Sequence, residues 1–489
     1  MAGLSKSRIL AHRQCPKRLW LQINKPELQE YNEGSTARMG AGTYAGEVAR
    51  SLYPEGVLID AEQLSQALLD TQSAMKNSTN AIFEATFQAD GVLIRVDLLL
   101  PDDNGYRLAE VKSSTTVKDY HYEDAAVQAW VAKTAGVRIT RTEIAHINTE
   151  FVYPGHENYQ GLFAHVDISA SIVAMEAEVP NWIAAAQQTL EGTEPDIKAG
   201  PHCEDPFTCP FLSYCCPEET NQEGYPPEIL PRAKALAAQL RSEGYDDLRN
   251  VPEQRLNPNQ QCIRRASINN QAELNPEAGE ILKALPYPWY YLDFETINLA
   301  VPVWAGTRPY VQIPFQWSCH IETADGNISH QEFLADGLGD PRRAFVESLI
   351  ATLNQSGTVL VYNASFENSC MHELAISYPD LAADLQAIID RVFDLLPLAR
   401  KYYYHPDMLG SWSIKAVLPT IAPELSYDDL EVSHGMMAME SFAELMRPET
   451  TLERRVHLRA ALLKYCERDT LAMVKIAHFF QQGVNDAIQ

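Results

Sequence analysis

The segment that most restricts the fold is VLIRVDLLLPDDNGYRLAEVKSS, residues 92–114. Two runs of β-forming residues flank PDDNG, a sequence typical of a hairpin turn. Because side chains alternate along a strand, Glu110 and Lys112 share one face. A four-residue DDNG loop would place Asp97 directly opposite Glu110, about 5 Å away. The sequence therefore predicts a hairpin that gathers two carboxylates and a lysine.

This predicted cluster suits a divalent metal ion. Two carboxylates so close repel each other unless a cation lies between them, and oxygen pairs are the ligands that Mg²⁺ or Mn²⁺ prefers. Lys112 would then orient a water or steady phosphate charge. The alternative is a half-solvated hairpin whose Glu110 and Lys112 face water. Asp97 argues against it, because an aspartate within VDLLL is costly without a partner.

The composition sets limits on the class of protein. The chain has 489 residues, of which 46% are hydrophobic and 21% charged, so it is long enough for two or three globular domains. It contains no run of about twenty apolar residues, and we expect a cytoplasmic protein with no membrane partner. The net charge of −26 means that any nucleic-acid contact must use a local basic groove or bound cations.

The pattern of apolar residues predicts two α/β domains. We expect the first at residues 1–217, a small helical connector at 218–286, and the second at 287–489. The segments expected to be helical are 7–23, 35–53, 123–136, 170–191 and 451–480, and those expected to be strands are 81–88, 91–100, 106–112 and 142–149.

A second set of acids lies in the C-terminal half. In YYLDFETI, strand alternation puts Asp293 and Glu295 on one face. In GTVLVYNASFENSCM, Glu367 follows a strand, and in LLKYCERDTLAM, Tyr465 and Asp469 share a helix face at i and i+4. Four acids on one side of a sheet could hold two divalent ions about 4 Å apart, the arrangement used in phosphodiester cleavage.

The cysteines indicate a metal site. There are nine, an odd number, which argues against a disulfide framework. Four of them fall within PHCEDPFTCPFLSYCCP, residues 201–217. Clustered thiolates suit zinc or an iron–sulfur cluster, and the alternative is a group of buried, incidental thiols.

The N-terminal motif resembles a known nuclease signature. Asp97, followed by Glu110-Val111-Lys112 and then Gln128, is similar to the PD-(D/E)XK motif of RecB-like nucleases. The resemblance implies that Asp97, Glu110 and the carbonyl of Val111 bind metal. It also implies that Lys112 assists the attacking water and that Gln128 lies near the site.

The same resemblance extends to Glu47 and to the cysteines. Glu47, in AGTYAGEVAR, lies where RecB-like relatives carry a helix-borne metal ligand, and the alternative is a solvated helix residue. One branch, which includes CRISPR-associated exonucleases and the AddB nuclease domain, binds a [4Fe-4S] cluster through one early and three late cysteines. That implies the ligands Cys15, Cys203, Cys209 and Cys215.

Two questions about this cysteine set stay open. The C-x5-C-x5-C spacing is wider than the C-x2-C-x5-C spacing common in the branch, so zinc remains the alternative metal. Cys216 also competes with Cys215 for the last ligand position. In either case the metal would join the first helix to the last loop of the domain, closing a long stretch of chain as a disulfide does.

The C-terminal acids resemble the DEDD exonucleases of the DnaQ-like, RNase H-type fold, in the subclass with a YxxxD third motif. The resemblance implies that Asp293, Glu295 and Asp469 bind metal and that Tyr465 positions the nucleophilic water. Glu367 stands where relatives usually have aspartate.

Two further residues have competing interpretations. Asp394, in VFDLLPL, is either a substitute metal ligand or a capping acid. Lys415, in GSWSIKAVLP, either contacts phosphate or is a surface lysine on a helix.

Taken whole, the chain resembles a bacterial family that fuses an iron–sulfur RecB-like nuclease to a DEDD-type exonuclease. This implies an Mg²⁺- or Mn²⁺-dependent nuclease with two active sites. Its substrate would be DNA, single-stranded or with free ends, in repair or in defence against foreign DNA. One alternative is an RNA-processing enzyme that uses the C-terminal site, with the N-terminal half as a platform. Another is a nucleic-acid-binding scaffold with decayed sites.

Overall fold

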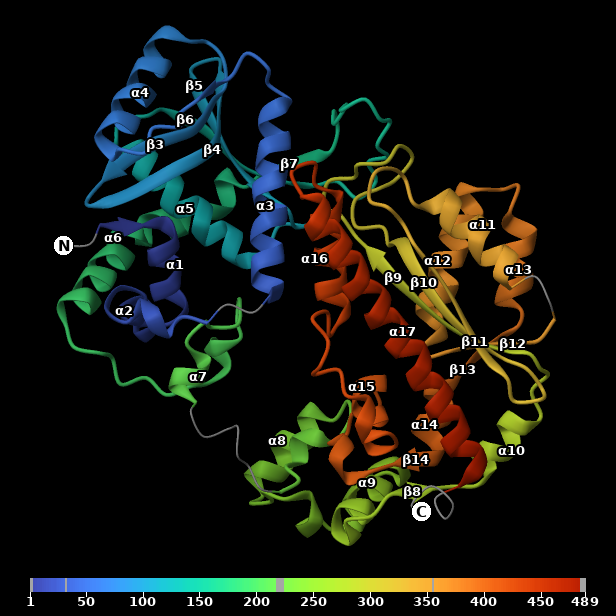
Figure 1. The fold of residues 1–489 in the computed structure, drawn as a ribbon. Coiled ribbons are helices and arrows are strands. Elements are labelled where there is room, and N and C mark those ends of the chain that lie inside the picture. The colour runs from blue at the N-terminus through green and yellow to red at the C-terminus, as the bar shows by residue number, and fades with distance from the viewer. Residues whose placement is uncertain (1–2, 31–32, 217–223, 354–355, 484–489) are drawn as a thin grey trace. The chain divides into compact units, whose positions relative to one another are not determined.

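The computed structural model describes residues 3–30, 33–216, 224–353 and 356–483, without the side chains of 33–38. The chain forms two compact units of mixed α/β structure (Figure 1). The N-terminal unit comprises residues 1–221 and 299–311, and the C-terminal unit comprises 222–298 and 312–489.

A seven-stranded sheet organises the N-terminal unit, in the order β2-β3-β4-β5-β6-β7, with β1 paired to β4. The strands are β1 (Leu4–Ser5), β2 (Val57–Leu58), β3 (Ile82–Ala89), β4 (Val92–Asp102), β5 (Gly105–Lys112), β6 (Ile139–Ile147) and β7 (Phe163–Asp167). The β4–β5 hairpin is antiparallel, whereas β5 runs parallel to β6.

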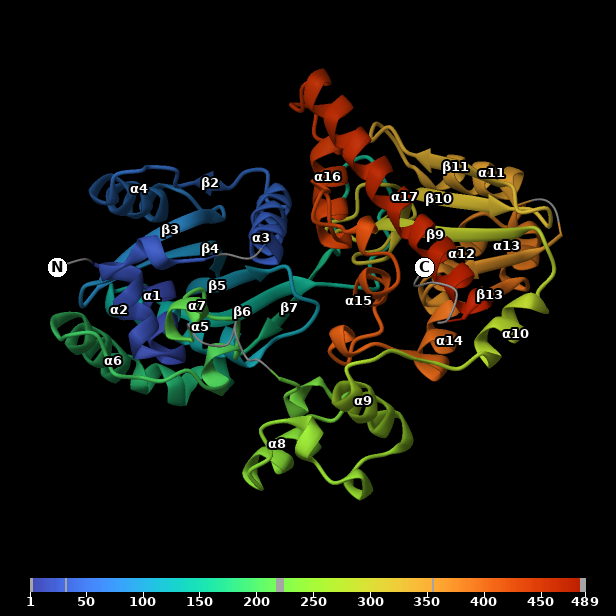
Figure 2. The ribbon, with the colours of Figure 1, turned by 60° about the horizontal axis from the view of Figure 1, so that its bottom comes forward.

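The helices of this unit are α1 (Lys6–Gln14), α2 (Pro16–Asn24), α3 (Glu33–Ser51), α4 (Leu64–Asn77), α5 (Asp119–Thr134), α6 (Ser169–Glu191) and α7 (Leu212–Cys215). Helices α1, α2, α5 and α6 pack together as one layer on the sheet (Figure 2). The single helix expected over 7–23 is two helices, because Cys15 is extended and Pro16, which has no N–H to donate, starts a new helix.

The C-terminal unit contains a five-stranded sheet in the order β11-β10-β9-β12-β13. Its strands are β9 (Trp289–Ile297), β10 (Ile313–Glu322), β11 (Ile328–Leu334), β12 (Thr358–Val361) and β13 (Val392–Asp394), and β8 (Glu273–Leu274) pairs separately with β14 (Tyr403–Tyr404). The central strand β9 is antiparallel to β10 and parallel to β12.

Ten helices of the described chain belong to this unit: α8 (Lys234–Ser242), α9 (Pro258–Asn269), α10 (Glu277–Lys283), α11 (Arg342–Thr352), α12 (Ala364–Ser377), α13 (Ala382–Ile389), α14 (Leu395–Tyr402), α15 (Ile414–Val417), α16 (Gly435–Met446) and α17 (Leu452–Gln482). The long helix α17 packs across β9 and β10 (Figure 1). Its first turn is capped by the hydroxyl of Thr451.

The segment expected to be a separate connector is part of the C-terminal unit. Leu240 of α8, Ile263 of α9 and Leu282 of α10 are fully buried in the same apolar core as Trp289 and Tyr291 of β9. Removing these side chains from water fastens the segment to the sheet. Within the described ranges, no helix has both the length and the apolar character that a bilayer span requires.

Candidate active sites

The β4–β5 hairpin sets the geometry of the N-terminal site. Its ladder pairs Leu98 with Ala109, so Asp97 and Glu110 are the next positions in register. The turn is shorter than expected, because Asp102 and Gly105 already pair and only two residues lie between them. The Asp97 carboxylate accepts a hydrogen bond from the backbone N–H of Val111 at 2.8 Å.

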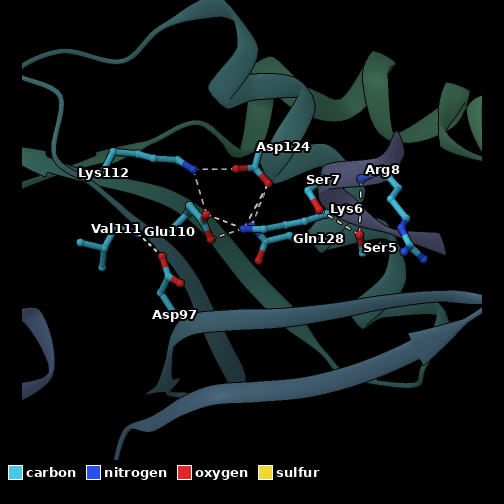
Figure 3. A network of polar contacts seen from close by, with 10 residues as sticks. All are labelled: Ser5, Lys6, Ser7, Arg8, Asp97, Glu110, Val111, Lys112, Asp124 and Gln128. Atoms are coloured by element: carbon cyan, nitrogen blue, oxygen red, sulfur yellow. Dashed lines mark hydrogen bonds and ion pairs between the residues drawn. The ribbon is translucent and has the colours of Figure 1, made fainter. Parts of the chain in front are cut away.

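Side chains from three elements meet around Glu110 (Figure 3). Lys112 Nζ lies 2.9 Å from Glu110 Oε1 and 2.6 Å from Asp124 Oδ2 on α5. Gln128, also on α5, donates to Glu110 Oε2 at 2.6 Å. Lys6, at the start of α1, lies 2.5 Å from Glu110 Oε1 and 3.3 Å from Asp124 Oδ1. The site thus contains its own cations.

Burial and charge shift the pKa values of this cluster in opposite directions. Burial and the neighbouring Glu110 carboxylate raise the pKa of Asp97 to about 8. Burial alone would raise the pKa of Asp124, but the ammonium groups of Lys6 and Lys112 hold it well below its ordinary value. Burial would likewise lower the pKa of Lys112, but Glu110 and Asp124 raise it. Asp97 is therefore the acid with the least compensated charge.

Two members of this site were not among the residues predicted from the sequence. Asp124 had a usable signal, because it stands in an alanine-rich helical stretch four residues before Gln128 and so shares a helix face with it. Lys6 had none, since the parallel pairing of β1 with β4 brings it to the site. The structure leaves Glu47 on the exposed side of α3, where it makes no hydrogen bond or ion pair with a described residue.

Four cysteines meet in the N-terminal unit. Cys15, Cys203, Cys209 and Cys215 line one small cavity, and Cys216 is not part of its lining. None of the described cysteines forms a disulfide. Basic side chains also line this cavity: Lys17, Arg18, Lys198 and His202.

The C-terminal site is a cavity of about 530 Å³ between β9, α12, α15 and α17. Asp293 and Glu295 point into it from β9, Glu367 from the first turn of α12, and Asp469 with Tyr465 from α17. The structure therefore gathers all five residues that the sequence motifs singled out. Each of these side chains is buried or half-buried.

These carboxylates carry charge that the protein does little to compensate. Burial, followed by the other carboxylates, raises the pKa values of Asp293 and Glu295 well above the ordinary range. Burial raises the pKa of Glu367 to about 8, and its Oε2 has no hydrogen-bond partner. Burial also raises the pKa of Asp469, to about 6. A divalent cation would relieve this cost.

A cysteine that the motifs did not include joins this site. Cys466, on α17, lies with its Sγ 3.9 Å from Asp293 Oδ2. Asp293, Glu295 and Cys466 offer three ligand atoms that all lie within 4.8 Å of one another. The turn of α17 that carries Tyr465 and Asp469 therefore also brings a thiol against the carboxylates.

A lysine and two tyrosines form the wall of the cavity beside Asp469. The Tyr427 hydroxyl donates to Asp469 Oδ1 at 2.5 Å. Lys415 Nζ lies over the rings of Tyr427 and Tyr465 and donates to the hydroxyl of Tyr465 at 3.3 Å. Lys415 is half-buried and faces the acids, so it is not a freely solvated surface lysine. Tyr427 lies in a loop, where no motif marked it.

Asp394 has a structural role. Its carboxylate accepts backbone N–H groups from Asn363 at 2.9 Å, Ala364 at 3.0 Å and Leu396 at 2.9 Å. These bonds cap α14 and tie it to the start of α12, which carries Glu367. Of the two interpretations of Asp394, the capping acid is the one that this geometry supports.

Comparison with known proteins finds a family match in the part of the chain that forms the C-terminal site. Residues 290–413 match the family described as "Domain of unknown function (DUF2779)". This stretch carries Asp293, Glu295 and Glu367, and it ends before Lys415 and Asp469.

Curated relatives are similar to part of the chain. The chain is 27% identical over 244 residues to "Uncharacterized protein UU173" of Ureaplasma parvum, and the aligned region covers 45% of this chain and 35% of that protein. The chain is 30% identical over 219 residues to "Uncharacterized protein MG366 homolog" of Mycoplasma pneumoniae, and the aligned region covers 40% of this chain and 33% of that protein. The matched part spans about a third of the length of these relatives.

Proposed function

We propose that this chain is a divalent-metal-dependent nuclease that hydrolyses phosphodiester bonds of DNA and that its principal catalytic site is the C-terminal cavity. One observation carries the proposal. Four carboxylates, those of Asp293, Glu295, Glu367 and Asp469, line one cavity in which Lys415 is the only basic residue among the described lining. An arrangement so poorly neutralised is suited to hold cations.

The residues around these acids have definable tasks. Two Mg²⁺ or Mn²⁺ ions, when bound, would supply Lewis acidity and an activated water. Tyr465 presents its hydroxyl beside Asp469 and positions the nucleophilic water. Lys415, 3.3 Å from that hydroxyl, steadies negative charge on the phosphate. Tyr427 holds the Asp469 carboxylate in place.

The arrangement of the C-terminal unit supports an RNase H-like assignment. Its acids come from a central strand, from the helix after the next parallel strand, and from a long helix across the sheet. Active sites of α/β proteins form where such strand ends and helices meet. We propose that residues 287–489 form a DnaQ-type domain of the DEDD class, with glutamate at the second motif.

We propose the N-terminal unit as a second, PD-(D/E)XK nuclease centre. Asp97 and Glu110 would hold a metal with the Val111 carbonyl, Lys112 would assist the water, and Gln128 would orient Glu110. Here Lys6 and Lys112 already neutralise Glu110 and Asp124. This internal compensation is why we assign the principal activity to the C-terminal cavity.

We also propose that Cys15, Cys203, Cys209 and Cys215 hold a [4Fe-4S] cluster. They do not form a set of three ligand atoms within 4.8 Å, whereas tetrahedral zinc holds thiolates about 3.8 Å apart. The basic residues around them suit an anionic cluster. The cavity between the four thiols has room for about one water. The thiols would therefore have to move apart to bind a cluster, whereas they would have to move closer together to bind zinc.

The test is an activity assay on end-labelled single- and double-stranded DNA and RNA with Mg²⁺ or Mn²⁺. We expect DNA to be degraded by the wild type and by Lys112→Met, and product formation to fall at least 100-fold in Asp293→Asn. The conservative control is Glu424→Gln, an exposed acid outside the cavity. Degradation of RNA alone would reassign the substrate, and intact substrates under every condition would refute the proposal.

A further inference from the structure

A second cavity, of about 770 Å³, adjoins the catalytic cavity in the C-terminal unit. The two cavities share three lining residues, Tyr362, Asn363 and Ile414, and so lie next to each other at the corner between β12 and α12. A volume of this size lies in the range of sites that enclose whole organic ligands. A ligand longer than the catalytic cavity would therefore meet the second cavity on passing Tyr362.

Two parts of the chain build the walls of this second cavity. Arg232 and Asn257 come from the segment before β9, and Arg400 and Trp412 come from α14 and the loop before α15. The two parts are held together by one apolar core that contains residues of both. The cavity is therefore a fixed feature of the C-terminal unit.

The charge of this cavity is opposite to that of the catalytic one. Arg232 and Arg400 both line it and are exposed, and its described lining includes no aspartate or glutamate. Neither guanidinium forms an ion pair with a described residue. The chain has a net charge of −26, and the cavity next to this one contains four acids. Two arginines without an acidic partner in such surroundings are suited to bind an anion. Guanidinium groups match phosphate oxygens in a forked geometry.

Tyr362 forms the boundary between the two cavities. Its hydroxyl donates to the carbonyl oxygen of Trp412 at 2.7 Å, which holds the ring in place. The side chain is half-buried and leaves part of its surface to both cavities. A fixed aromatic ring beside a basic surface is the combination that binds single-stranded nucleic acids without regard to sequence, because every base can stack.

We propose that the second cavity binds the sugar-phosphate backbone of a single polynucleotide strand whose end lies in the catalytic cavity. This inference rests on the proposed function of the catalytic cavity. Arg232 and Arg400 contact successive phosphates, and Tyr362 stacks on the base between them and the reacting end. The shared chemistry is a single-stranded phosphodiester chain, DNA or RNA.

The test compares Arg232→Gln/Arg400→Gln with wild type on three probes. These are fluorescein-labelled dT12, fluorescein-labelled U12, and bis(p-nitrophenyl) phosphate, which is small enough to need only the catalytic cavity. Arg232 already has φ +54°, so glutamine adds no new backbone strain. The control is Arg447→Gln/Lys475→Gln, which removes the same charge from exposed positions outside both cavities.

We expect KM for dT12 to rise at least tenfold, with kcat within twofold and with hydrolysis of bis(p-nitrophenyl) phosphate unchanged. Binding is measured by fluorescence anisotropy with Ca²⁺ in place of Mg²⁺. The slope of log affinity against log salt concentration should become shallower by about 1.4 in the variant, because each of the two lost single-strand phosphate contacts contributes about 0.7. A similar loss of affinity for U12 would show that the site also binds RNA. A loss of affinity for dT12 or U12 alone would show which of the two polymers the site binds.

Two results would overturn this inference. One is unchanged affinity and salt slope in the arginine variant, and the other is an equal loss in the control variant. Failure of the proposed function looks different, because then no probe is hydrolysed by any form. In that case, arginine-dependent binding of dT12 would still support the second cavity as a strand-binding site.

Discussion

The phenol oxygen of Tyr427 lies 2.5 Å from Oδ1 of Asp469 and donates a hydrogen bond to it. Burial raises the pKa of Asp469 to about 6, and this hydrogen bond opposes the rise by stabilising the charged carboxylate. Burial and the same carboxylate raise the pKa of Tyr427, which keeps the phenol protonated as a donor. A residue outside every motif thus sets the state of a proposed metal ligand.

Replacing Tyr427 with phenylalanine should weaken metal binding more than folding. A hydrogen bond to a charged group contributes about 1.5–3 kcal/mol, so we expect the Mn²⁺ concentration for half-maximal nuclease activity to rise about tenfold or more. Titration of activity with Mn²⁺ measures this. The control is Tyr403→Phe, which removes a buried phenol bonded to Thr420 away from the cavity. An unchanged Mn²⁺ requirement in Tyr427→Phe would show that the bond does not support the metal site.

Lys6→Met should destabilise the N-terminal unit, and a divalent ion should reverse much of the loss. Lys6 neutralises Glu110 and Asp124, whose side chains are 4% and 6% exposed. Breaking a buried ion pair costs about 3–5 kcal/mol, and because Lys6 is itself a quarter exposed we expect roughly 2–3 kcal/mol. Calorimetry with and without Mn²⁺ checks this.

The control for that experiment is Lys133→Met, which removes an exposed ion pair with Glu176 from the same unit. It should change the unfolding temperature little, with or without Mn²⁺. If Mn²⁺ stabilises wild type and Lys6→Met equally, the ion does not take the place of the Lys6 ammonium group.

Local patterns predicted the elements that carry the sites. The helix expected at 451–480 is α17, from Leu452 to Gln482, because its apolar periodicity and the Thr451 cap are both local signals. The hairpin expected to align Asp97 with Glu110 has that register, because alternation and the turn residues specify it. Information of this kind is contained within one or two elements.

The parts that the sequence did not predict depend on contacts between distant segments. Lys6 reaches Glu110 because β1 pairs with β4, about which the residues around Lys6 carry no signal. Tyr427 and Cys466 belong to the C-terminal site through packing, one from a loop and the other from the buried face of α17. The sequence predicts residues 218–286 as a separate connector because its helices are short, and short helices give no local sign of the apolar surface that they bury against β9.

Cys15→Ser and Cys216→Ser should behave differently. Cys15 lines the cavity shared by the three later cysteines, and Cys216 does not. We expect Cys15→Ser to abolish metal incorporation and to lower the unfolding temperature of the N-terminal unit, because the metal closes a long loop of chain. Cys216→Ser should keep both. Iron and zinc analysis with absorbance near about 400 nm measures the outcome, since iron–sulfur clusters absorb there and zinc sites do not. Equal metal content in both variants would exclude Cys15 as a ligand.

The contribution of His320 to the stability of the C-terminal unit should fall on mild acidification. Burial, followed by the charge of His330, lowers the pKa of His320 to about 4 from its ordinary 6.5. Its ring nitrogen Nδ1 lies 2.8 Å from the Thr470 hydroxyl on α17, inside the unit.

Between these two pKa values the unfolded chain binds a proton that the folded chain does not. The contribution of His320 is therefore complete above about pH 6.5 and is lost as the pH falls towards 4, by roughly 3 kcal/mol in all. Calorimetric unfolding of the C-terminal unit between pH 7.5 and 4.5 should show this contribution as the difference between wild type and His320→Gln, because the buried carboxylates with raised pKa values titrate in both forms. The exposed histidine variant His372→Gln should keep the wild-type slope. Parallel pH profiles for wild type and His320→Gln would assign the acid sensitivity to other groups.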